Sequence, residues 1–591
     1  MGKPFSYDLS DLSGGLNEKA AQTLSDREMS VLRDFYVVGT SLLSREGRVA
    51  IAGAYLNSFG VSERINSITR YNPSFTPDEY TIVGAASSIA RLVGRTLQPI
   101  IPSNAVYPTL TSRWWFKQYN DELFACQKGN GGVKRIYGDS QVNAGIDAPA
   151  VAPQAIDGGA GQKPAGSYWV AYSFFNSITG AESNLSPLSK ELAVADLHAL
   201  AVSVIGTSTN LQVNARRIYA TLADDQGTLY LVGQIDDNVT TTFFENALPP
   251  ADYGAAFSAV NGTPPDQAHS LETYKERLFV TNKLGLYWSE AGKPQSFRAS
   301  AYYPLAQGTG YDLVGLKHWE DHGLVIGAQD QTHILRGTTP DDWEVVRLSG
   351  EHGSPAGQSY VVGDGVLFWY TGTNFVRSGG SSAEIIPGSD RVRATLDSIP
   401  DASKEDVQGE ALPARGWVVW TVTTLSGQRL VVYDYKADAW EVFSTAPDTI
   451  KRFVKSDQSE VLLAAWDADD ILREYLIGST DDGAAITASF RTKALDYGLP
   501  GFAHTVSRVT LWCPLTAGSV TVSVRDGSTG VSLASRTVSV NSNGPKRVGI
   551  STMGSPVHLN QIEVQYTGKA QLRIDRLQIE GVHIQRRATV L

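Results

Sequence analysis

The chain is poor in the features that mark disulfide-stabilised and membrane-spanning proteins. Its 591 residues include only 2 cysteines, Cys126 and Cys513, which lie far apart in the sequence. A disulfide framework is therefore not expected, and synthesis in a reducing compartment is. The N-terminus has no apolar signal segment. No apolar run approaches the roughly 18 residues that a membrane helix needs, so we expect no membrane span.

Positive charge is also scarce. The chain has 50 Lys and Arg against 61 Asp and Glu, which gives a net charge of −11. Its basic residues occur as scattered pairs such as Arg216-Arg217, and no base-reading helix is visible. The negative net charge argues against a protein that binds nucleic acid by neutralising its phosphates. It does not exclude a surface past which DNA slides.

Recognisable catalytic and metal-binding motifs are missing. There is no phosphate-binding glycine loop, no dinucleotide fingerprint, no nucleophile elbow and no cysteine pair with zinc spacing. His318 and His322 have the spacing that binds zinc on one helix face, but the flanking strand patterns and Gly323 place them in a turn. We therefore predict no catalytic, cofactor-binding or metal-binding residues, no cofactor and no enzyme activity.

Adjacent aspartates recur along the chain. Two carboxylates across a pocket would suit a glycosidase, whereas Asp residues at hairpin ends usually cap turns. We favour the turn-capping interpretation because each pair falls at a predicted hairpin boundary. The pairs are Asp224-Asp225, Asp236-Asp237, Asp341-Asp342, Asp469-Asp470 and Asp481-Asp482.

The sequence is rich in a repeated strand–turn–strand pattern. Apolar strands separated by Gly- or Asp-marked turns begin at Glu276, His322, Asp364, Gly416 and Glu460, so the unit recurs every 42 to 52 residues. A repeating all-β unit of this size is typical of a β-propeller blade, which must pack against neighbouring blades to bury its faces. The 12 tryptophans fall largely within such strands, and we expect them to pack between blades rather than to form an exposed sugar platform.

Changes in composition divide the chain into further parts. The predicted fold is all-β, with a β-propeller-like core, an inserted fibronectin-III-like β-sandwich module and a C-terminal β-sandwich. Ser25 and Glu28 have capping-box spacing and predict one short helix that runs to about Phe35. The expected parts are an N-terminal segment with the first blades (1–142), an Ala/Gly/Pro-rich linker or gate loop (143–166), the inserted module (167–247), a Pro/Gly-rich loop (248–268), the remaining blades (269–485) and the C-terminal sandwich (486–591).

Several segments resemble those of the tail nozzle of short-tailed bacteriophages, also called the tail tubular or packaged-DNA stabilisation protein. The N-terminal stretches DLSGGLNEKAAQTLSDREM from Asp11 and SLLSREGRVAI from Ser41 are similar to the opening of such proteins. GAESNLSP from Gly180 and NARRIYATLADDQGTLYLVGQI from Asn214 are similar to strands of their inserted module. The blade segments YKERLFVTNKLGLYWSEAGKPQSF and VVYDYKADAWEVF complete the resemblance, which covers most of residues 8 to 480.

The resemblance implies a structural virion protein, made in the bacterial host cytoplasm and located in the phage tail. It implies a homohexameric ring below a tail adaptor protein, with fibres or spikes outside. Genomic double-stranded DNA would be retained there and then ejected through the lumen without sequence-specific contacts. A negative wall fits such a conduit because it repels DNA. The loops 143–166 and 248–267 are the expected gates.

Two other classes remain open from the sequence. One is another tail component, such as a fibre-attachment or receptor-binding protein, which would form trimers with an elongated shaft. The other is a propeller glycosidase, which would turn over sugars and depend on one of the acidic residues.

Overall fold

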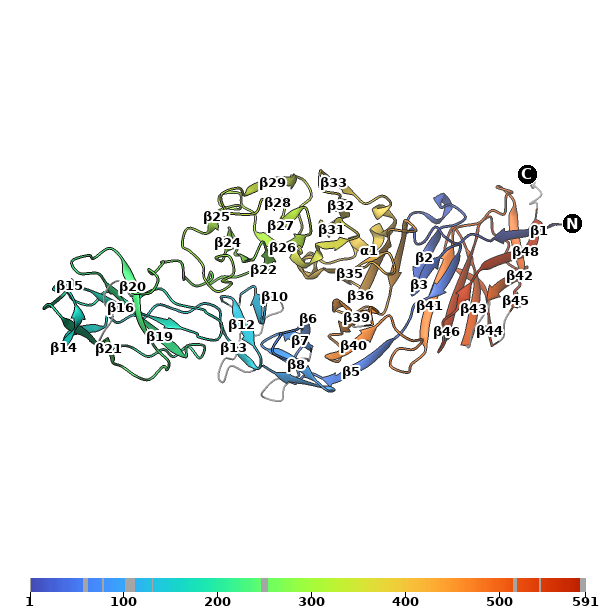
Figure 1. The fold of residues 1–591 in the computed structure, drawn as a ribbon. Helices are drawn as coiled ribbons and strands as arrows, with labels where there is room; N and C mark the ends of the chain where they lie inside the picture. The colour runs from blue at the N-terminus through green and yellow to red at the C-terminus, as the bar shows by residue number, and fades with distance from the viewer. Residues whose placement is uncertain are drawn as a thin grey trace.

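The computed structural model describes residues 2–56, 62–76, 79–100, 112–129, 131–245, 253–455, 457–513, 518–541 and 544–584. The molecule is elongated and all-β, with three parts in a row: an inserted module at one end, a propeller in the middle, and a sandwich that contains the first and last strands, β1 (Lys3–Leu9) and β48 (Arg576–Ile584), at the other end (Figure 1). Within the described residues, the single α-helix is the short α1 (Arg393–Asp397).

Seven four-stranded antiparallel blades form the propeller in the described part of the chain. In chain order they are β6–β9 (Ile65–Tyr71, Tyr80–Ala85, Ile89–Val93, Thr96–Pro99), β10–β13 (Trp114–Tyr119, Glu122–Gln127, Lys134–Tyr137, Ser140–Asn143), β22–β25 (Ser270–Tyr274, Arg277–Thr281, Leu286–Trp288, Tyr302–Tyr303), β26–β29 (Leu313–Trp319, Gly323–Ala328, Thr332–Arg336, Glu344–Ser349), β30–β33 (Val361–Gly363, Val366–Tyr370, Phe375–Ser378, Ala383–Ile385), β34–β37 (Gln408–Leu412, Trp417–Thr424, Gly427–Asp434, Ala439–Phe443), and β38–β40 (Thr449–Val454, Glu460–Ala465, Ile471–Tyr475) with β5 (Arg48–Ala54). We number them blades 1 to 7. The five repeats expected from the sequence are confirmed as the central hairpins of blades 3 to 7.

The first strand of each blade lies nearest the propeller axis, and these inner strands contact one another around the ring. Strand β38 of blade 7 packs against β6 of blade 1, which closes the circle. Between blades 4 and 5 the contact is made through the turn η3 (Gly357–Ser359), where the backbones touch. A Cβ added to Gly315 would lie 2.6 Å from Gly357 Cα, so this junction requires glycine on both sides.

Buried tryptophans join adjacent blades, as expected. The indole of Trp114 in blade 2 donates to Ala85 O of blade 1 at 2.7 Å, and that of Trp420 in blade 6 donates to Ser359 O at 3.1 Å. Trp319 in blade 4 donates to Gly365 O of blade 5 at 3.0 Å. Each side chain therefore fills the space between blades and satisfies its one polar group there.

The N-terminal 47 residues lie outside the propeller, and blades 1 and 2 follow them in the chain. Strand β1 (Lys3–Leu9) pairs with β48 (Arg576–Ile584), and β4 (Ser41–Ser44) pairs with β3 (Phe35–Val38) and β47 (Arg573–Ile574). The chain enters the propeller only at β5, the outer strand of blade 7, which pairs with β40. Blade 7 is thus built from β5, near the start of the sequence, and β38–β40, which come after blade 6. The pairing of β5 with β40 closes the propeller.

The predicted helix from Ser25 to Phe35 is wrong. Ser25 N does donate to Glu28 Oε2 at 2.8 Å, as in a capping box, but the next residues form β2 (Met29–Arg33). This strand lies between β37 of blade 6 and β41 (Ile486–Thr492). Pairing with two strands that are distant in sequence outweighs the local helix signal, because it buries Met29 and Leu32 completely.

The C-terminal sandwich is continuous with the propeller. One of its two sheets is an extension of blade 6. The four strands of blade 6 continue through β2 and β41 to β46 (Asn560–Gly568), β43 (Gly518–Asp526) and β44 (Ser532–Ser539), which gives a sheet of nine strands. The facing sheet is β1, β48, β42 (Ala503–Cys513) and β45 (Gly544–Gly549). A single apolar core extends from Leu577 and Val564 in the sandwich to Phe375 and Trp440 in blades 5 and 6. The two parts are therefore packed as one body.

The inserted module leaves the chain between blades 2 and 3 and has its own core. One three-stranded sheet is β14 (Gln154–Lys163), β18 (His198–Ser203) and β21 (Phe243–Glu245), and the other is β16 (Val170–Phe175), β19 (Ala215–Thr221) and β20 (Leu229–Ile235). Strands β15 (Gly166–Tyr168) and β17 (Leu192–Val194) form a small ladder beside them. The expected fibronectin-III-like insertion is thus a two-sheet sandwich.

The segment 143–166, expected to be a linker or gate loop, is instead part of this module. Its residues 154–163 are strand β14, which pairs with β18 through two register shifts. Glycines here serve close packing, since a Cβ on Gly161 would lie 2.6 Å from Ala199 N, and one on Gly158 would lie 2.8 Å from the Phe244 ring. In the loop 248–268, residues 248–252 lie outside the described residues, and Gly262 bridges to Phe297.

Candidate functional site

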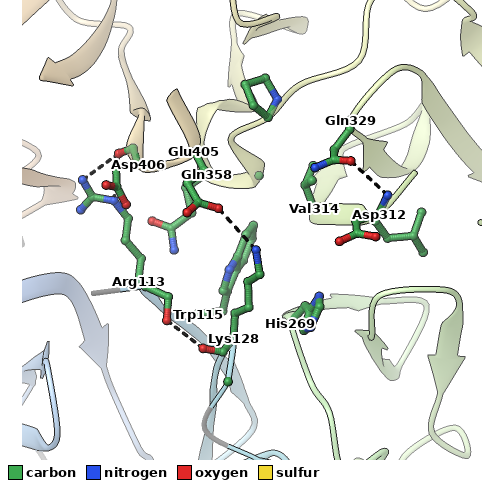
Figure 2. Close-up of a pocket in the computed structure, with 15 residues that line it drawn as sticks. Arg113, Trp115, Lys128, His269, Asp312, Val314, Gln329, Gln358, Glu405 and Asp406 are labelled. Atoms are coloured by element: carbon green, nitrogen blue, oxygen red, sulfur yellow. Dashed lines mark hydrogen bonds and ion pairs between the residues drawn. The ribbon is translucent and has the colours of Figure 1, made fainter. Parts of the chain in front are cut away.

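One pocket lies where the inner strands begin, at one mouth of the propeller axis. Its volume is about 340 Å³. Blades 2, 3, 4 and 6 contribute Arg113, Lys128, His269, Asp312 and Glu405, among others, as Figure 2 shows. Trp115, Gly357 and Gln358 line both this pocket and a cavity of about 120 Å³ further along the axis.

Arg113 holds the ring together at this mouth. Its guanidinium donates to Asn66 O (2.9 Å), to Asp448 O (2.6 Å), to Asp406 O (2.9 and 3.1 Å) and to Gln408 Oε1 (3.3 Å). These acceptors come from blade 1, from the entry and inner strand of blade 6, and from the link between blades 6 and 7. Burial lowers the pKa of Arg113 to about 10, so the group stays charged at neutral pH.

The other charged groups of the pocket have ordinary structural roles. Lys128 Nζ and Glu405 Oε2 form an ion pair at 3.3 Å, and both side chains are more than half exposed. Burial raises the pKa of Asp406, an effect that Arg113 opposes. Burial also lowers the pKa of His269, which is therefore uncharged at neutral pH. The pocket can accept a polar ligand. Ser112 carries the one hydroxyl among its described lining residues, and this hydroxyl donates to Lys128 O and not to a general base.

The two histidines considered from the sequence flank a β turn and do not share a helix face. His318 is the next-to-last residue of β26, and His322 is the last residue of the turn, with its ring tilted against Trp319 at a centroid distance of 4.2 Å. Within the described residues, no group of three His, Cys, Asp or Glu side chains is placed to hold a metal ion. Also within the described chain, no helix is long and apolar enough to cross a membrane.

The aspartate pairs cap turns, as predicted. Asp237 Oδ1 accepts from Val239 N (2.9 Å) and Thr240 N (2.8 Å), and Asp342 Oδ1 accepts from Thr338 N (2.9 Å) and Thr339 N (2.6 Å). Several of these aspartates also bind buried arginines: Asp481 accepts two bonds from Arg45, at 2.9 and 2.6 Å, and Asp237 accepts one from Arg216 at 2.9 Å. No sequence motif marks Arg45 or Arg113, since their partners are distant in the chain.

Comparison with known proteins adds a fold likeness only. No family model matches this chain, and no curated protein sequence matches it. Among solved structures, BBS1N in complex with ARL6DN is similar at 10% identity over 74% of this chain and 99% of that one, with a TM-score of 0.26. The Pan2 WD40 domain of Neurospora crassa matches at 11% identity over 73% and 95%, with a TM-score of 0.25. An exo-β-1,3-galactanase of Phanerochaete chrysosporium matches at 10% identity over 90% and 100%, with a TM-score of 0.17. All three scores are low, so they carry no argument about function.

Proposed function

We propose that this protein is a structural subunit of a bacteriophage tail nozzle, in which six copies form a ring that retains genomic double-stranded DNA and passes it at ejection. The observation that carries the proposal is the end-to-end arrangement of sandwich, propeller and module (Figure 1). A ring subunit needs two different complementary faces, and an elongated body with a protruding module provides separated surfaces for them.

The module has a surface suited to a second copy. Nine of the 23 exposed large apolar side chains in the described chain lie on it: Val151, Ile156, Ile178, Leu188, Leu197, Val204, Leu211, Val239 and Phe244. Ile156, Ala201 and Phe244 form one cross-strand row on the sheet β14-β18-β21. Ile156 is 45% exposed and Phe244 is 52% exposed. Contiguous apolar patches on soluble proteins mark interaction sites, so we assign this row to the interface between neighbouring copies.

The charge of the chain supports the same proposal. A net charge of −11 favours a wall that DNA passes without being held. The propeller axis is not the DNA path in this proposal, because Arg113 bridges it at one mouth. The lumen would lie between copies of the chain.

The test is assembly of the purified full chain, followed by mass measurement and negative-stain microscopy with and without the tail adaptor protein. We expect sixfold rings with a central hole, either alone or on the adaptor. Phe244→Asp should abolish the rings. Leu425→Asp, in a propeller hairpin at a side chain that is 83% exposed, is the matched control and should leave them intact.

Other outcomes would replace the proposal. Trimers would favour a fibre-attachment or receptor-binding component. A monomer that does not bind the adaptor and that degrades polysaccharide would favour a glycosidase.

A further inference from the structure

The propeller axis contains a ring of charged side chains, which we call the axial ring. Its members are Lys117, Glu272, Lys317, Glu410 and Lys451, contributed by the inner strands of blades 2, 3, 4, 6 and 7. They line one cavity of about 120 Å³. Charges that line a protein cavity interact more strongly than charges in bulk water, so their balance determines what the cavity can hold.

Four of the five charges are paired between adjacent blades. Lys117 Nζ pairs with Glu272 Oε1, and Lys451 Nζ pairs with Glu410 Oε1 at 2.6 Å. Lys317 has no ion pair and no side-chain hydrogen bond within the described part of the chain. With all five groups ionised, the axial ring therefore carries one uncompensated positive charge.

The surroundings of Lys317 show that this charge is not relieved by the protein. Burial and then the positive charge of Lys451 lower the pKa of Lys317, and Glu410 and Glu272 only partly oppose them. The two carboxylates are already engaged by the other lysines. An anion in the cavity would favour the charged form of Lys317.

A second unpartnered group faces the same cavity. Ser67, on β6 of blade 1, is only 3% exposed, and its hydroxyl has no hydrogen-bond partner. Blades 1 and 4 lie on opposite sides of the propeller axis, so Ser67 and Lys317 line the cavity from opposite sides. The amides that also line the cavity are committed: Gln358 donates to Trp114 O, and Gln408 accepts from Arg113 and Ile450. A buried hydroxyl without a partner points to a polar occupant.

We propose that the axial cavity binds one small oxyanion, of the size and charge of inorganic phosphate or sulfate, between the Lys317 ammonium and the Ser67 hydroxyl. The ammonium supplies the charge-assisted hydrogen bond, and the hydroxyl donates a second one. The cavity holds several times the space that one water needs, which leaves room for a tetrahedral anion. The bound anion offsets the positive charge of the axial ring and joins opposite blades.

The test is thermal unfolding of the full chain in a buffer free of oxyanions, titrated with inorganic phosphate, sulfate or chloride at constant ionic strength. We expect phosphate or sulfate to raise the unfolding temperature and chloride to have no such effect, because a ligand of the folded state stabilises it by mass action. Lys317→Met should weaken the oxyanion effect about 10- to 100-fold, as expected for loss of a charged hydrogen bond. Ser67→Ala should weaken it by a smaller factor.

The matched control separates this site from general charge effects. Lys317→Met removes an uncompensated charge, so without added anion it should unfold at the same temperature as the wild type or higher. Lys117→Met removes a paired lysine and leaves Glu272 buried alone, so it should unfold at a lower temperature. If Lys317→Met does not fold, the same measurements are made on Lys317→Gln. An oxyanion effect that persists in the Lys317 variant, an equal effect of chloride, or no effect of any anion would overturn the proposal.

Discussion

Replacing Arg113 with alanine is expected to weaken the propeller ring at one mouth of its axis. The change removes five hydrogen bonds, at 2.6 to 3.3 Å, to the backbone oxygens of Asn66, Asp406 and Asp448 and to the side chain of Gln408. Each net hydrogen bond from a charged group contributes about 1.5–3 kcal/mol. The adjoining pocket can supply water to some of the freed acceptors, so we expect a total loss of about 3–4 kcal/mol.

The matched control is Lys128→Ala in the same pocket. Its ammonium makes an exposed ion pair with Glu405 at 3.3 Å, and such pairs contribute about 0–1 kcal/mol. The two variants remove one cationic side chain each, so a difference between them reports the geometry of Arg113 and not the charge of the pocket. Arg113→Lys should behave like the alanine variant, because one ammonium nitrogen cannot take the positions of the three guanidinium nitrogens that donate here.

The assay is urea unfolding followed by tryptophan fluorescence, together with amide hydrogen exchange by mass spectrometry. Faster exchange in Arg113→Ala should be concentrated in the inner strands β6, β34 and β38, next to the lost acceptors. A loss below about 1 kcal/mol, or an equal loss in Lys128→Ala, would refute the view that Arg113 holds the ring together.

Two further predictions concern the sandwich and its junction with the propeller. Arg45 is 1% exposed and binds Asp34 (2.7 Å) and Asp481 (2.6 Å), so Arg45→Met should cost about 3–5 kcal/mol in urea unfolding by leaving buried carboxylates unpaired. His504 is fully buried against His583, and burial lowers its pKa from 6.5 to about 4. The unfolded state then binds more protons, so stability should fall by about 2–3 kcal/mol as the pH drops from 6.5 to 4, and His504→Phe should flatten that part of a pH-dependent unfolding curve.

The sequence predicted the hairpins within the blades better than it predicted how the blades close into a propeller. The second and third strands of blades 3 to 7 were predictable because their turns carry Gly and Asp and their apolar runs are long. The short inner strands, such as β30 with three residues, have no such signal. Closure of blade 7 by β5 joins Arg48 to Tyr475, and no local pattern predicts a pairing between such distant residues.

The errors have a common physical cause, because local signals were interpreted without their tertiary neighbours. Ser25 and Glu28 do form the expected hydrogen bond, yet the strand β2 follows them because it pairs with β37 and β41. Gly158 and Gly161 suggested a flexible loop, whereas close contacts with Phe244 and Ala199 require glycine at both positions. The axial ring was unpredictable for the same reason, since Glu272, Lys317 and Glu410 are distant in sequence and line one cavity only when the blades close.

The junction between sandwich and propeller is apolar, whereas the junction between propeller and module is polar. This difference determines which parts could move when copies of the chain associate. Sandwich and propeller share one apolar core and one nine-stranded sheet, so separating them would expose a large buried surface. The module has a separate core, and polar bonds hold its junction with the propeller: Gln212 donates to Gly145 O at 2.7 Å, and Gly145 N donates to Gln295 Oε1 at 3.0 Å. Polar junctions break and re-form at little net cost, because water replaces the lost bonds. If copies associate through the apolar row of Ile156 and Phe244, movement of one copy against the next would therefore be taken up at Gly145, while each sandwich and propeller moves as one body.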